Sequence, residues 1–106
     1  MDFSKTVLDH AEFRPDKFFK TTLFQGQAMM VGLNCLEPGQ IQKAHQHADQ
    51  DKFYFVLQGT GRFLLGSEQL EGLEGDIVWA PAGLEHGVEN YGNRQLILLV
   101  GIAPAP

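Results

Sequence analysis

The chain has 106 residues and a formal net charge of −5 at pH 7, and a chain of this length can bury roughly 60 to 70% of its unfolded surface in one domain. A hydrophobic fraction of 43% and a charged fraction of 20% exclude an intrinsically disordered protein. The eight Lys and Arg residues are scattered singly, without the basic stripe that displaces counterions from DNA or RNA, so we exclude a nucleic-acid partner.

The first 17 residues precede the strand-rich part of the chain. We expect residues 1–106 to form one domain in which residues 1–17 are an extension that packs on the domain or on a partner subunit. The opening MDFSKTVLDH lacks the cationic and apolar regions of a secretory signal. The longest apolar run, LILLVGIA at 96–103, is shorter than the about 20 residues that cross a bilayer. With Cys35 as its single cysteine, expected in the core, the chain is predicted to be cytoplasmic, with no membrane partner.

Turn-forming segments divide the rest of the chain into short apolar runs. EPGQ, QGTG, APAG and NYGN are examples, and such segments recur every eight to twelve residues. This rhythm predicts an all-β sandwich or barrel. No helical period is convincing after residue 17, and the predicted strands cover residues 18–24, 27–36, 52–58, 61–66, 76–79, 86–90 and 95–102.

The pair Gly59-Thr60 suits a two-residue hairpin turn with Gly at its first central position. Pairing Gln58 with Gly61 across that turn assigns two faces. One face would carry Lys52, Tyr54, Val56, Phe63 and Leu65, and the other Phe53, Phe55, Leu57 and Arg62. Both sets are largely apolar, so we expect a second sheet on one side and a partner subunit on the other. The sequence therefore predicts a homodimer.

Two histidines, His45 and His47, stand at i and i+2 before the strand predicted at 52–58. In an extended segment these positions share a face, which lets both imidazoles approach one ion. A solvent-exposed turn that happens to hold two histidines is the plain alternative.

A second stretch, GDIVWAPAGLEHGVEN at 75–90, carries Gly, Pro, His and Asn at fixed spacings. It resembles the second motif of the cupin superfamily, and the segment from Gly39 to Gly59, with its His-X-His, resembles the first. The chain is therefore similar to a small single-domain cupin. The resemblance implies a double-stranded β-helix, or jelly-roll barrel, that holds a divalent metal (Fe, Zn, Ni or Mn) on His45, His47 and His86.

The chain departs from this family at one position, because counting back from Gly59 places Lys52 where a ligating Glu is usual. A protonated lysine is a poor ligand, and its charge is unfavourable beside a divalent ion. Three explanations stay open. Lys52 turns away and leaves three histidines, a β-bulge turns Asp51 inward, or Gln50, which shares strand parity with Lys52, offers its carbonyl oxygen.

The side chains near the expected metal have further candidate roles. Lys52 is a candidate base or a clamp for a substrate carboxylate, against the plainer interpretation that it pairs with Asp51, Asp49 or another rim carboxylate. Tyr54 is a second candidate for proton transfer. We expect a cavity lined by Tyr54, Val56 and Phe63, with Trp79 at its mouth.

The resemblance implies a metal-dependent enzyme that acts on a small molecule. Iron would favour a dioxygenase, whereas zinc, nickel or manganese would favour Lewis-acid isomerase, decarboxylase or lyase chemistry. The alternative is a non-catalytic cupin that binds a small ligand as a sensor or store. The residues alone do not choose between these reactions, because one fold hosts many of them.

Overall fold

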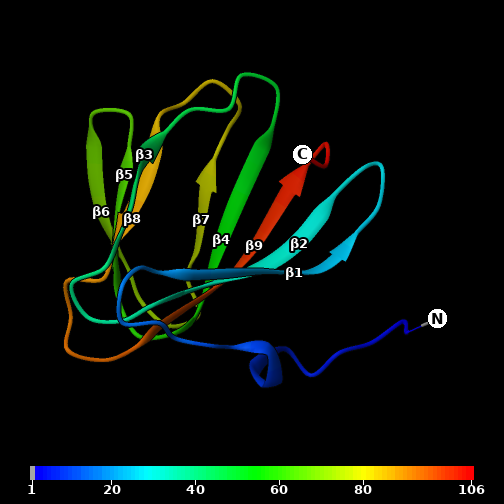
Figure 1. Ribbon diagram of the computed structural model, residues 1–106. Coiled ribbons are helices and arrows are strands. Elements are labelled where there is room, and N and C mark those ends of the chain that lie inside the picture. The colour runs from blue at the N-terminus through cyan, green and yellow to red at the C-terminus, as the bar shows by residue number, and fades with distance from the viewer. Residues whose placement is uncertain (1) are drawn as a thin grey trace.

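The structure, a computed structural model, describes residues 2–106, and its regular secondary structure is almost entirely antiparallel β-strands in two facing sheets (Figure 1). The five-stranded sheet has the order β1-β2-β9-β4-β7, and the four-stranded sheet has the order β3-β8-β5-β6. The predicted all-β double-stranded β-helix is thus confirmed. The elements are η1 (Val7–His10), β1 (Phe19–Gln25), β2 (Met30–Leu36), β3 (Ile41–His45), β4 (Asp51–Gln58), β5 (Gly61–Leu65), β6 (Glu68–Gly72), β7 (Ile77–Ala80), β8 (His86–Glu89) and β9 (Leu96–Ala103).

Every predicted strand is present with its ends displaced by a few residues, but the prediction missed β3 and β6. Both strands are largely exposed. Their sequences, IQKAH and EQLEG, bury only Gln42 and Gly72. A strand at the margin of a sheet with so few apolar residues lacks the alternation on which sequence-based detection rests.

The predicted hairpin at Gly59-Thr60 is wrong. β4 pairs with β7 and β9, whereas β5 pairs with β6 and β8, so these two residues carry the chain from one sheet to the other. Gly59 has a φ of +85°. A Cβ at this position would lie 2.6 Å from the carbonyl oxygen of Gln95. Both the backbone conformation and the close approach of the segment before β9 therefore require glycine here.

The predicted inner face of β4 is nevertheless correct, because alternation along one strand does not depend on its partner. Lys52, Tyr54 and Val56 are all buried, and Phe63 of β5 faces them from the other sheet. The main core lies between the two sheets and also includes Leu36, Val78, Ala80, Val88, Leu96, Leu98, Val100 and Ile102.

Asn90 holds together the turns at one end of this core. It is fully buried, and its Nδ2 donates hydrogen bonds to the carbonyl oxygens of Leu36, at 2.9 Å, and Arg94, at 2.8 Å. Asn90 therefore fixes the backbone on both sides of this turn.

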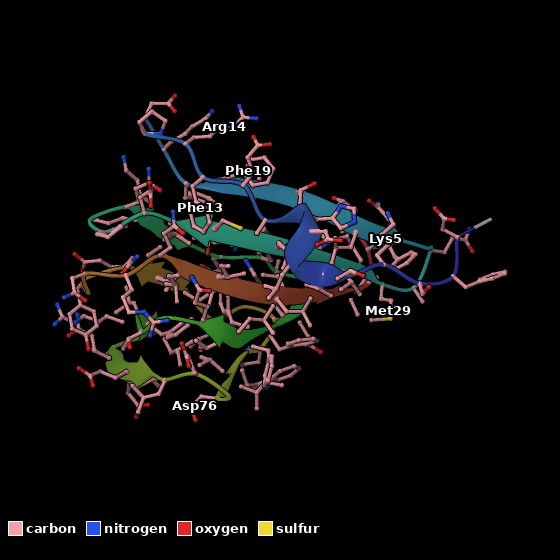
Figure 2. The ribbon with its side chains drawn as sticks, turned by 90° about the horizontal axis from the view of Figure 1, so that it is seen from below. Lys5, Phe13, Arg14, Phe19, Met29 and Asp76 are labelled. Atoms are coloured by element: carbon pink, nitrogen blue, oxygen red, sulfur yellow. The ribbon has the colours of Figure 1, made fainter. Side chains whose placement is uncertain are left out.

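A second cluster lies on the outer face of the five-stranded sheet. Leu23, Leu33, Cys35 and Ile97 form it, and Val7, Ala11 and Phe13 from the N-terminal segment pack against it. Figure 2 shows this segment running beside the sheet, with Phe13 and Phe19 close to the strands. Cys35 is buried, as expected. Residues 2–106 contain no helix that is long and apolar enough to span a membrane.

Candidate metal centre

Two paired strands of the four-stranded sheet and the loop that follows one of them bring His45, His47 and His86 together. His45 ends β3 and lies opposite His86, the first residue of β8, while His47 follows two residues later in the loop to β4. The ring centroids of His45 and His86 are 4.3 Å apart, and those of His45 and His47 are 4.8 Å apart. The candidate ligand atoms of all three side chains lie within 4.8 Å of one another. Pairing of β3 with β8 thus places two rings, and the i, i+2 spacing adds the third.

Backbone carbonyls fix the orientation of two of these rings. The Nδ1 of His45 lies 2.9 Å from the carbonyl oxygen of Lys43, and the Nδ1 of His86 lies 2.9 Å from that of Leu84. Because a carbonyl only accepts, each Nδ1 carries the proton in the neutral ring and each Nε2 presents its lone pair. Within residues 2–106, the buried Nε2 of His86 has no hydrogen-bond partner.

This donor set fits a divalent transition metal. A buried acceptor without a partner is destabilising, and a bound cation would satisfy it. Three nitrogens at about 2.0–2.1 Å from one ion lie roughly 3.0–3.6 Å apart, so modest ring movements close the observed separation. Burial lowers the pKa of both His86 and His47, and the nearby charges of His45 and Lys52 act in the same direction. The rings are therefore held in the neutral form that binds metals.

The two candidate oxygen donors in place of the missing glutamate lie differently. Gln50 faces the cavity beside the histidines, and its Nε2 donates to the carbonyl oxygen of Pro104 at 3.0 Å. This leaves its Oε1 as the amide atom available to an ion. Asp51 is exposed, and its Oδ1 accepts from the amide of Ala82 at 2.8 Å. The irregularity in β4 lies after Val56, so the bulge that would turn Asp51 inward is not there.

Lys52 lies inside the barrel and is only 4% exposed. Its Nζ sits 4.5 Å from the centroid of the Tyr54 ring. Ion pairs found within residues 2–106 join other side chains, so the expected pairing of Lys52 with Asp49, Asp51 or another rim carboxylate is wrong. Burial, with a smaller contribution from the charge of Lys20, lowers the pKa of Lys52 to about 8.

Tyr54 packs beneath the histidines. Its ring centroid lies 6.2 Å from that of His86, and its hydroxyl donates to the Oε1 of Gln42 at 2.6 Å. The side chain is fully buried, and burial raises the pKa of the hydroxyl. Because this phenol is buried, hydrogen-bonded to Gln42 and has a raised pKa, it is better suited to positioning Gln42 than to proton transfer.

The cavity beside the histidines has a volume of about 760 Å³ and differs from the expected one. Tyr54, Val56 and Phe63 belong to the packed core. Trp79 is 56% exposed and pairs with Phe53, outside the cavity lining. The walls come instead from β1, β2 and the end of β9, which the sequence pattern does not connect with the site. They include Lys20, Met30, Asn34, Val100 and Ile102, together with Gln42 of β3.

Comparison with known proteins gives matches along most of the chain. The sequence model of the cupin domain family matches residues 32–102. A solved structure from Thermus thermophilus superposes with a TM-score of 0.94 at 38% identity, covering 97% of this chain and 98% of that one. An uncharacterized protein of Streptomyces coelicolor is 33% identical over 72% of this chain and 71% of its own length. An oxalate-binding protein of Thermotoga maritima is 31% identical over 63% of this chain and 55% of its own length.

Proposed function

Since this chain belongs to the cupin domain family, we propose that His45, His47 and His86 hold one divalent transition metal, at which the protein acts on a small molecule. The observation that carries the proposal is the buried Nε2 of His86, which has no hydrogen-bond partner in residues 2–106 and belongs to a cluster of three ligand atoms. Iron, zinc, nickel and manganese all accept imidazole ligands, and imidazole alone does not select among them.

The proposed activity is that of a dioxygenase or of a Lewis-acid isomerase, decarboxylase or lyase. A bound ion would supply polarisation of a substrate oxygen or, in the case of iron, activation of dioxygen. The protein's own residues would orient the substrate. Gln50 can add a neutral oxygen ligand, Lys52 can hold negative charge on the substrate, and Tyr54 fixes the amide of Gln42 at the cavity wall.

Metal content tests this proposal directly. Protein purified without chelator and without a histidine tag is expected to contain about one transition metal per chain by elemental analysis. His86→Gln and His47→Ala should each reduce the content to a small fraction, whereas His10→Gln, at an exposed histidine outside the cluster, should leave it unchanged. Trace metal in the folded parent protein would overturn the proposal.

A non-catalytic binding protein is the second candidate. Asp and Glu side chains are absent from the described residues that line the cavity, so a carboxylate base is lacking there. Metal-loaded protein that binds small acids and never consumes them or dioxygen would favour this candidate, and turnover would favour the enzyme.

The proposal includes a cytoplasmic homodimer. Ile77 and Trp79 of β7 are 66% and 56% exposed, and Phe53 and Phe55 of β4 lie next to them on the outer face of the five-stranded sheet. Large apolar side chains side by side on a sheet favour burial by a second copy. Light scattering of the parent protein should give twice the mass of one chain. The Trp79→Glu variant should have the mass of a single chain. Ile41→Glu, at an exposed position on the other sheet, should not; a monomeric parent protein would refute the dimer.

A further inference from the structure

Two buried residues that line the cavity carry side-chain hydrogen-bond donors. Asn34 of β2 is 5% exposed, and its Nδ2 has no hydrogen-bond partner within residues 2–106. Lys52 of β4 is 4% exposed, and no carboxylate of the described chain pairs with it. Both residues line the cavity that also contains His45 and His47. A buried amide without an acceptor, in the same cavity as an ammonium without a carboxylate partner, points to a ligand that carries oxygen atoms.

The cavity has a positive charge balance. Lys20 lies on its wall together with Lys52, and the lining residues within 2–106 contribute no Asp or Glu side chain. A divalent ion on three neutral imidazoles would add two further positive charges, because these ligands neutralise none of its charge. A cavity with this field favours an anion over a neutral molecule.

The two donors belong to residues at different positions along the sheet. In the sheet, Asn34 pairs with Leu98 of β9, and Lys52 pairs with Ile102, four residues farther along the same strand. Strands advance by about 3.3 Å per residue, so the two positions are separated along the strand by more than the width of one carboxylate. One ligand that satisfies both donors must therefore carry several oxygen atoms along its length.

We propose that the cavity binds a polyoxygenated organic acid, with a carboxylate of the ligand on the Nζ of Lys52 and a second oxygen on the Nδ2 of Asn34. The inference deepens the proposed function, on which it rests for the metal-bound end of the ligand. It also gives a role to the lysine that replaces the usual glutamate: Lys52 receives the charge of the ligand and leaves the metal to the histidines. The Lys52 contact itself needs no metal.

Calorimetric titration with three acids of increasing length tests the proposal. The probes are oxalate, succinate and gluconate, each compared with its neutral amide, on metal-loaded and chelator-treated full-length protein. At least one acid should bind the metal-loaded protein, and its amide should bind at least about tenfold more weakly. Lys52→Met should weaken binding of that acid by about ten- to hundredfold, the range for a hydrogen bond to a charged group. Lys17→Met, at an exposed lysine outside the cavity, should have no effect.

The second donor has its own test. Asn34→Leu, which keeps the branched skeleton of the side chain and removes its donor, should weaken binding of gluconate or succinate by about two- to tenfold. Oxalate should be less affected, because the shortest acid cannot span both donors. Circular dichroism confirms that each variant is folded.

The two proposals fail in different ways. The anion site is refuted, and the metal function kept, if the metal-containing protein binds none of the acids. The same holds if the parent protein and the Lys52→Met variant bind them equally well. If the purified protein contains no metal but its acid binding still depends on Lys52, the metal function is refuted and the anion site is kept. Equal binding of acid and amide also overturns the anion site.

Discussion

Replacing Lys52 with methionine is expected to raise the free energy of unfolding of the metal-free protein by about 2–3 kcal/mol at pH 7. The ammonium is 4% exposed and has no carboxylate partner in the described chain, so folding removes it from water without compensation beyond the Tyr54 ring. Burial lowers its pKa to about 8 from an ordinary 10.5, which corresponds to roughly 3 kcal/mol. The contact with the aromatic face offsets part of that penalty, and methionine fills a similar volume without charge.

The gain should depend on pH in a defined direction. Between about pH 8 and 10.5 the unfolded chain keeps a proton on Lys52 that the folded chain has released, so the parent protein becomes more stable as pH rises. Below pH 8 both states are protonated and the penalty is fully present. Urea unfolding of chelator-treated protein should therefore show a large advantage of Lys52→Met at pH 7 and a much smaller one at pH 10.

Lys17→Met is the matched control, since Lys17 is exposed, and it should change stability by less than about 0.5 kcal/mol. A loss of stability in Lys52→Met at pH 7, or a gain independent of pH, would contradict the burial argument. The same unpaired charge that destabilises the free protein is what an acid in the cavity would neutralise. An acid that binds should consequently stabilise the parent protein more than the variant.

The histidine cluster could be predicted because its residues follow local rules. His45 and His47 share a face by strand alternation, and the Gly, Pro and His spacing from residue 75 to 90 resembles a known family. What brings His86 to them is the pairing of β3 with β8. That pairing could not be derived from the pattern, because β3 buries a single side chain and shows no apolar alternation.

The remaining errors arise where partner choice is decided at long range. The partners of β4 are β7 and β9, which are distant from it in sequence. A sequence that favours a tight turn at Gly59 is therefore insufficient to predict that β4 pairs with β5. Asn34 was missed for a similar reason, since only the packing of β2 places it on a cavity wall. One signal was present, because Asn34 is the only amide in the otherwise apolar run MVGLNCL, and a lone polar residue in a buried strand requires a partner.

Metal loading is expected to stabilise the protein by about 4 kcal/mol when the free ion is a thousandfold above its dissociation constant. For a domain of this size such a gain corresponds to a rise in Tm of roughly 15 °C or more. Thermal unfolding of chelator-treated protein, with and without zinc or manganese, measures it. His86→Gln removes the buried ligand and should abolish most of the shift, whereas His10→Gln should retain it. Equal shifts in the parent protein and in His86→Gln would place the ion elsewhere.

The metal-induced shift should disappear in acid, because protons and metal compete for the same imidazole nitrogens. Burial lowers the pKa of His47 and His86 below the ordinary 6.5, so these rings remain neutral at a pH where an exposed histidine is already protonated. The shift should therefore be fully present at pH 7 and persist below pH 6.5, then fade as pH falls further. If it vanished above pH 6.5, rings that are easily protonated and open to water would be the ligands, and the buried Nε2 of His86 would no longer account for the site.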